Sequence, residues 1–174
     1  FGQSIPIVIG TTGWDADKPA IRKLCLDKEQ ALFTASNFSI GMNLFFLLNR
    51  YLAGIMNSYR DYDILLEEIH HIHKKDKPSG TAITLAEIST GEINRKSGWS
   101  MERGGNPEKL QVQSIREGEV TGTHKVIYDS PIDSITLIHA AKNRRGFALG
   151  AIMAAEWLQG KKGFFGMEDM IKPE

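Results

Sequence analysis

The sequence has little that would tie it to a membrane, a nucleic acid or an oxidising compartment. Its one cysteine, Cys25, excludes a disulfide within these 174 residues, as expected in a reducing cytoplasm. The apolar run Ile40–Met56 is interrupted by Asn43, Asn49 and Arg50, and falls short of the ~18 apolar residues of a membrane span. Basic and acidic residues balance at 21 each, whereas nonspecific nucleic-acid binding needs a basic surface. We therefore expect a cytoplasmic protein that binds neither membrane nor nucleic acid.

The first third of the chain predicts a parallel βαβ unit. The apolar run Ile5–Ile9 reads as a strand buried on both faces. Asp15 or Asp17 can cap a following helix, Lys18–Lys28, and Leu32–Ala35 reads as the next strand. Strand, helix and strand in this order form a right-handed, parallel crossover in nearly all known cases.

The pattern of the remaining chain predicts two long helices and several strands. Expected in order are helix Ile40–Tyr59 capped by Ser39, strand Asp61–His71, helix Ser79–Asn94, a long loop Lys96–Lys109, strands Gln111–Ile115, Gly122–Asp129 and Ser134–Ala140, and helix Arg145–Gln159 stopped by Gly160. A glycine-containing turn, Arg116–Glu119, joins the first two of the late strands. Gly163–Met167 is expected to be a docked loop.

The stretch Glu67–Ala82, EEIHHIHKKDKPSGTA, holds three of the five histidines at a strand-to-helix crossing. Taken singly, a strand histidine is most often a hydrogen-bonded structural group, and Ser79–Thr81 reads equally well as a helix cap. Taken together, the histidines suit proton transfer near neutral pH. Lysines and the free amides of a helix N-terminus bind carboxylates. The stretch therefore predicts a site for a small acidic substrate.

Metal binding is the alternative interpretation of the same residues. His70, His71 and His73 have the right ligand chemistry for zinc, which would indicate a metal-dependent hydrolase. Their spacing matches neither the helical i, i+4 pair nor a zinc finger, and the neighbouring lysines repel a cation. We predict no metal here.

Two small-residue loops follow neighbouring strands of the predicted βαβ unit. Gly10–Gly13 comes after the first strand and Ala35–Phe38 after the second. Parallel strands present their carboxyl ends at one edge, where α/β sheets bind ligands. The two loops are therefore expected to contribute to one binding surface.

The segment HHIHKKDKPSGTA closely resembles the signature of the 4-hydroxy-tetrahydrodipicolinate reductase (dihydrodipicolinate reductase) family. Three further segments match this family in order: VIGTTGW, ASNFSIGMNL, and REGEVTGTHKV followed by ITLIHAAKNRRGFALGA. The resemblance implies an α/β plus α+β fold, in which a Rossmann-type dinucleotide-binding domain precedes a mixed-sheet domain for substrate binding and tetramerisation. It also implies reduction of a small cyclic dicarboxylate by NADPH or NADH, in the diaminopimelate route to lysine, by a homotetramer.

The resemblance assigns roles to individual residues. His70 matches the proton donor or acceptor and Lys74 a second proton donor. The residues that it implies for binding the substrate carboxylates are His71, Ser79, Gly80 and Thr81. Those that it implies for binding the nicotinamide end of the cofactor are Gly10, Thr11, Thr12, Ala35, Ser36, Asn37, Phe38 and Arg144.

One departure from the family is a missing motif. No G-x-x-G-x-x-G turn follows a first strand in this sequence, so residues 1–38 read as a residual part of the dinucleotide-binding domain. Residues 39–149 read as the substrate and tetramerisation domain, and 150–174 as a C-terminal helix and tail that pack back on the first part. We expect a fragment with weak cofactor affinity and little activity alone. A non-catalytic oligomerisation module derived from such a reductase is the alternative.

Overall fold

The computed structural model describes residues 5–102 and 104–171. The chain divides into two compact units, one of Phe1–Leu44 with Arg144–Glu174 and one of Phe45–Asn143. The outer ends of the expected segments 1–38 and 150–174, and Arg103 in the expected loop, lie outside the described residues. The domain boundaries expected from the sequence stay a prediction.

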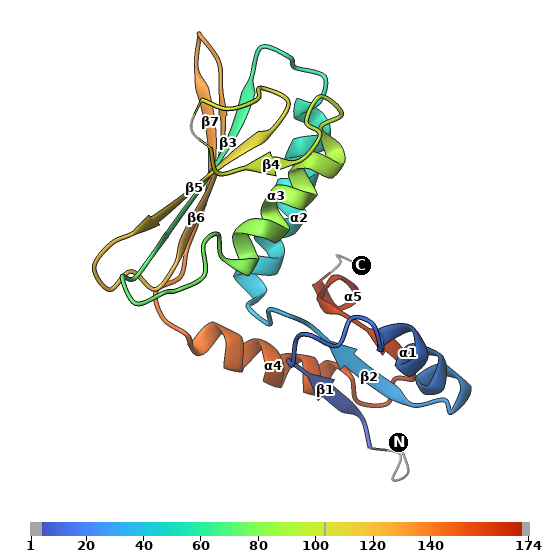
Figure 1. Ribbon diagram of the computed structural model, residues 1–174. Coiled ribbons are helices and arrows are strands. Elements are labelled where there is room, and N and C mark those ends of the chain that lie inside the picture. The colour runs from blue at the N-terminus through green and yellow to red at the C-terminus, as the bar shows by residue number, and fades with distance from the viewer. Residues whose placement is uncertain (1–4, 103, 172–174) are drawn as a thin grey trace. The chain divides into compact units, whose positions relative to one another are not determined.

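The first unit contains a parallel three-stranded sheet in the order β1 (Ile7–Ile9), β2 (Ala31–Thr34) and β8 (Gly163–Phe165). Helix α1 (Lys18–Asp27) connects the first two strands (Figure 1). The predicted parallel βαβ unit is therefore confirmed.

Three local expectations in this unit were wrong. The stretch beginning at Gly163 is a strand, because it pairs with β2 from far along the chain, a partner that no local pattern reveals. Strand β1 is half-buried rather than buried, since it lies at the edge of this sheet. Asp17 occupies the N-cap of α1 without a side-chain cap bond, and Asp15 instead pairs with Lys18 at 2.6 Å.

The core of the first unit joins β2 to the C-terminal elements. Phe33 stacks on Phe38 with ring centroids 5.9 Å apart and meets Trp157 edge-on at 6.0 Å. Ala154 and Leu158, in and just after α4 (Arg145–Trp157), are buried with them. The short helix α5 (Met167–Ile171) adds Met167.

The second unit contains a mixed five-stranded sheet. Its order is β4 (Trp99–Ser100), β5 (Leu110–Arg116), β3 (Asp63–His70), β6 (Thr123–Asp129) and β7 (Ser134–Ala140). Strand β3 pairs parallel with β5 and antiparallel with β6. Strands β5 and β6, neighbours along the chain, are therefore separated by β3 in the sheet.

Helices α2 (Ile40–Met56) and α3 (Gly80–Glu92) lie side by side on one face of this sheet (Figure 1). Buried Asn49 of α2 joins them, since its amide donates to the Leu85 carbonyl at 3.1 Å and its oxygen accepts from the Ser89 hydroxyl at 3.1 Å. In the described parts of the chain, no helix has both the length and the apolar character needed to cross a membrane.

Candidate active site

Strand β3 carries two ionisable residues into the interior of the second unit. Its burial alternates strictly, and Ile64, Leu66, Glu68 and His70 are its buried residues. Because side chains alternate across a strand, Glu68 and His70 occupy positions of the apolar core face. A carboxylate in such a position needs partners that offset its lost hydration.

Glu68 is fully buried and has partners from three other parts of the unit. Its Oε1 accepts from the Ser79 amide at 3.1 Å and from Arg116 Nη2 at 3.2 Å. Its Oε2 lies 3.1 Å from His70 Nδ1. Burial alone would raise the pKa of Glu68, but the interactions with His70, Ser79 and Ser114 outweigh it and hold that pKa far below its usual range. The carboxylate is therefore ionised at neutral pH.

His124 of β6 completes the buried group. Its Nε2 lies 3.3 Å from the Ser79 hydroxyl and 3.9 Å from Glu68 Oε2. The His70 and His124 rings meet edge-to-face, with centroids 5.1 Å apart. Burial, and next the nearby His70, lower the pKa of His124 to about 4. His124 is thus a neutral, uncharged neighbour of the Glu68–His70 pair at neutral pH.

The predicted carboxylate-binding turn forms the start of α3. Ser79 is the N-cap, and its hydroxyl accepts from the Ala82 amide at 3.2 Å. Gly80 is exposed and Thr81 half-buried in the first turn. The amides at a helix start point outward and, with the helix dipole, favour an anion. The amides of Gly80 and Thr81 therefore lie where a helix start can bind an anion, whereas the Ser79 amide already donates to Glu68 and its hydroxyl caps the helix.

The segment after β3 holds the other predicted residues. Lys74 is partly buried, with its Nζ 2.8 Å from Asp76. His71 is half-buried, and its Nδ1 has no hydrogen-bond partner among the described residues. His73 is exposed and lies 3.2 Å from Glu119. Arg116 donates to the carbonyls of Lys74 and Asp76 and so fixes this segment against β5.

The predicted cofactor loops belong to the first unit. The exposed residues Gly10, Thr11 and Thr12 follow β1, and Ala35 to Phe38 follow β2. A Cβ on Gly10 would lie 3.3 Å from the Phe38 ring, so the two loops touch. The Asn37 side chain accepts from the Ser39 amide at 2.9 Å and orders the turn, while Ser36 is exposed. Arg144 is exposed at the N-cap of α4.

Three residues of the site were missed from the sequence: Glu68, Arg116 and His124. A signal for Glu68 was present, because a carboxylate at every-other-residue spacing from Ile64 and Leu66 occupies a core position of a strand. Arg116 and His124 stand in the matching segment REGEVTGTHKV, but nothing in the sequence placed them next to Glu68. They approach Glu68 only because β5 and β6 flank β3, which the local pattern does not predict.

The metal interpretation applies to a different set of residues than the sequence indicated. Among the described residues, the group that could share an ion is Glu68, His70 and His124, whose candidate ligand atoms lie within 4.8 Å of one another. The guanidinium of Arg116 already donates a hydrogen bond to the Glu68 carboxylate. Its positive charge would repel a cation there. The cluster is better suited to handling a proton.

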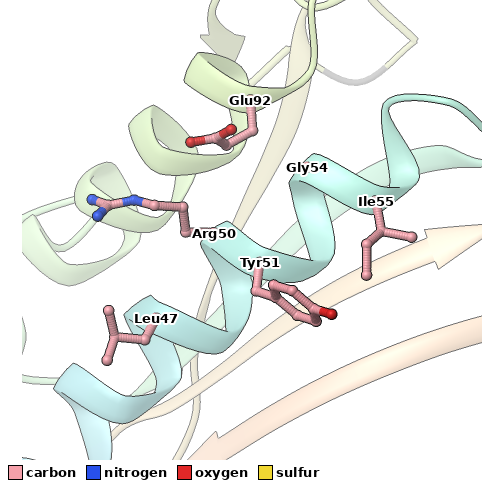
Figure 2. A pocket seen from close by; sticks show the side chains of 6 residues that line it. All are labelled: Leu47, Arg50, Tyr51, Gly54, Ile55 and Glu92. Carbon is pink, nitrogen blue, oxygen red and sulfur yellow. The ribbon is translucent and has the colours of Figure 1, made fainter. Parts of the chain in front are cut away.

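A shallow hollow of about 550 Å³ lies elsewhere on the second unit, over α2 and α3. Figure 2 shows it lined by Leu47, Arg50, Tyr51, Gly54, Ile55 and Glu92. Its lining holds no histidine and none of the residues predicted from the sequence for the site. The cluster around Glu68, in contrast, contains the predicted residues His70 and Ser79.

Comparison with known proteins finds related sequences along most of the chain. The sequence profile described as "Dihydrodipicolinate reductase, C-terminus" matches residues 41–171. The 4-hydroxy-tetrahydrodipicolinate reductase of Christiangramia forsetii is 47% identical over 171 residues, covering 98% of this chain and 71% of that protein. The enzyme of the same name from Laribacter hongkongensis is 37% identical, covering 97% of this chain and 65% of that protein. The chain thus spans about two thirds of the length of these relatives.

A solved structure is similar as well. The dihydrodipicolinate reductase of Paenisporosarcina sp. TG-14, solved with dipicolinate bound, superposes with a TM-score of 0.74 at 26% identity. The match covers 94% of this chain and 64% of that one.

Proposed function

This chain belongs to the dihydrodipicolinate reductase family, and on that premise we propose that the protein reduces 4-hydroxy-tetrahydrodipicolinate with NADPH or NADH in the diaminopimelate route to lysine. The reaction consumes a reduced nicotinamide and a proton, and it yields tetrahydrodipicolinate, the oxidised cofactor and water. We also propose a cytoplasmic location, in keeping with the single, buried, unpaired Cys25.

The observation that carries the proposal is that the buried carboxylate of Glu68 joins His70, the predicted proton donor, to the turn Ser79–Thr81, which is predicted to bind the substrate. Glu68 contacts both His70 and the Ser79 amide. His70 and Lys74 serve as proton donors, because the negative charge that develops on a reduced imine is relieved by protonation. His71, Ser79, Gly80 and Thr81 bind the substrate carboxylates through charge-assisted and helix-terminal hydrogen bonds.

The first unit suits the nicotinamide end of a dinucleotide. Gly10 lies so close to the Phe38 ring that a side chain would crowd the space between the loops. Gly10, Thr11, Thr12 and Ala35 to Phe38 would hold the cofactor there, with Arg144 as a further cationic contact. The bound cofactor supplies the hydride.

A homotetramer built through the sheet is part of the proposal. Strand β7 is the edge of the five-stranded sheet. Ile135 and Ile138 on this strand are 40% and 59% exposed, and Ile132 in the preceding turn is 93% exposed. Exposed apolar side chains at a strand edge are typical of an interface between copies. Analytical ultracentrifugation of Ile138→Lys, which we expect to shift the protein towards smaller species, tests this point.

Calorimetric titration with pyridine-2,6-dicarboxylate tests the substrate site in the full-length protein. We expect binding by the wild type, and binding weakened about tenfold or more by His71→Ala, since a charge-assisted hydrogen bond contributes roughly 1.5–3 kcal/mol. His73→Ala is the matched control, because His73 lies in the same segment but is exposed and faces Glu119. No binding by the wild type would exclude the proposed substrate class.

A further inference from the structure

Glu68 has no assigned role in the reaction, yet it is the most connected buried ion of the second unit's site. We propose that Glu68 is a positioning residue that fixes the tautomer of His70. It also holds His70, the proposed proton donor, in a fixed position relative to the turn Ser79–Thr81. The inference rests on the proposed function for its chemistry. Its geometry depends only on contacts within the second unit.

The first step of the argument concerns the two ring nitrogens of His70. Nδ1 lies 3.1 Å from Glu68 Oε2, an ion-pair contact outside hydrogen-bond geometry, and neither atom has a hydrogen-bond partner among the described residues. Buried polar atoms are rarely left without a partner, and at this distance the two atoms can satisfy each other. A carboxylate can only accept, so Nδ1 must carry the hydrogen when the ring is neutral. The transferable proton is therefore the one on Nε2.

The second step concerns the space around Nε2. Gly122 faces this nitrogen, and a Cβ at position 122 would lie 3.0 Å from it. The absence of a side chain at this position lets the ring lie against the backbone of Gly122. The orientation set by Glu68 thus turns the proton-bearing nitrogen towards a position in the chain where a side chain would displace it.

The third step is that the carboxylate also sets the position of the other predicted residues. Glu68 Oε1 accepts from the Ser79 amide and from Arg116. Arg116 in turn donates to the carbonyl of Lys74. Only an ionised carboxylate can accept all three donors, since a glutamine would direct an NH₂ group at one of them. Glu68 therefore links the histidine, the lysine segment and the turn.

The experiment compares Glu68→Gln and Glu68→Asp with the wild type in the full-length protein. Glu67→Gln is the matched control: Glu67 is the adjacent carboxylate on the opposite face of β3, where it pairs with Lys125. The readouts are the ¹⁵N chemical shifts of the His70 ring at a pH where the ring is neutral, and kcat and KM for the reduction.

We expect wild-type His70 to carry its neutral-form proton on Nδ1, and Glu68→Gln to shift the tautomer population towards Nε2. In Glu68→Gln kcat falls roughly tenfold or more while KM changes less, because the turn keeps an acceptor for the Ser79 amide. Glu68→Asp recovers part of the lost kcat, and Glu67→Gln behaves as the wild type.

Two results would overturn the proposal. One is a wild-type His70 whose neutral form is protonated on Nε2, which needs no variant and holds even if Glu68→Gln does not fold. The other is a folded Glu68→Gln protein with wild-type tautomer and kcat, as a purely structural role predicts. Failure of the proposed function is separate, because it would appear as an inactive wild type whose His70 still shows the Nδ1–H tautomer.

Discussion

A methyl group on Gly150 would lie 1.7 Å from the carbonyl oxygen of Phe38. Helix α4 therefore packs against the backbone of the predicted cofactor loop with no room for any side chain. This contact explains a glycine in the middle of a helix, where alanine would otherwise be favoured by about 1 kcal/mol. The position of Phe38, and with it the loop Ala35–Phe38, depends on that close approach.

Gly150→Ala is expected to destabilise the protein by roughly 1–3 kcal/mol or more, because overpacking against backbone cannot be relieved by a rotamer change. Gly146→Ala on the same helix is the control, since its Cβ would meet only the Ser39 hydroxyl at 3.7 Å. Denaturant unfolding should show a large loss for Gly150→Ala and little change for Gly146→Ala. Equal stabilities of the two variants would contradict the packing argument.

Gly122→Ala is expected to lower activity through His70. The new Cβ would lie 3.0 Å from Nε2 and 3.2 Å from Cδ2, so the ring must move. A displaced catalytic group costs up to about 100-fold in rate. The variant also carries backbone strain, because Gly122 has φ of +154°.

Gly118→Ala separates the ring contact from the strain. Gly118 has φ of +45°, and a Cβ there would meet nothing within 4 Å. We expect this control to lose about 1 kcal/mol of stability and to retain its kcat. If the two variants reduce the substrate equally well, contact with His70 is not what requires glycine at position 122.

Because His124 is buried, we expect the free energy of unfolding to fall on mild acidification. Burial lowers its pKa in the folded protein to about 4, against an ordinary value of 6.5. Between these pH values the unfolded chain binds a proton that the folded protein does not, so the free energy of unfolding rises with pH. His124 leaves the free energy of unfolding at its full value above pH 6.5. As the pH falls from there towards 4, the free energy of unfolding decreases by on the order of 3 kcal/mol in all.

The measurement is denaturant unfolding at pH 7 and pH 5 of the wild type and His124→Gln. We expect the wild type to be less stable at pH 5 by about 2 kcal/mol more than the variant. Burial also lowers the pKa of His139, but His139 is present in both proteins and cancels in the comparison. His73→Gln, at an exposed site, should keep the wild-type pH dependence. An identical pH dependence of wild type and His124→Gln would refute the assignment.

The elements that the sequence predicted well are those encoded within one segment. The periodicity of Ile40–Met56 and the capping serine at 79 gave helices α2 and α3 nearly to their ends, and the apolar runs gave β1, β2 and β3. The mixed sheet and the family, both implied by the motif resemblance, were confirmed as well.

The features that could not be predicted from the sequence depend on contacts between segments far apart in the chain. Strand β8 exists because Gly163–Phe165 pairs with β2, and three residues are too few to show a period of their own. The partners of Glu68 come from β5, β6 and the start of α3, so only the strand order brings Arg116 and His124 to it. Motif resemblance named the residues proposed to meet the substrate and omitted Glu68, the buried carboxylate that contacts His70 and Ser79.

Lys74 and Lys75 are adjacent in the sequence, and the structure predicts opposite consequences for replacing them. Lys74 is partly buried, its Nζ lies 2.8 Å from Asp76, and its carbonyl is held by Arg116, whereas Lys75 is exposed. Replacing Lys74 by methionine keeps the aliphatic bulk and removes the charge. We expect Lys74→Met to weaken binding of pyridine-2,6-dicarboxylate about tenfold or more and to lower kcat, while Lys75→Met changes neither.

Calorimetry at two ionic strengths distinguishes a direct contact from a general field. A direct Lys74–carboxylate contact should give a difference between the two variants that persists at high salt, because partly buried pairs are screened less than exposed ones. If Lys75→Met weakens binding as much as Lys74→Met, and salt abolishes both effects, the lysines act only through long-range attraction. Lys74 would then lose its proposed role as a proton donor, since a donor must reach the substrate within hydrogen-bond distance.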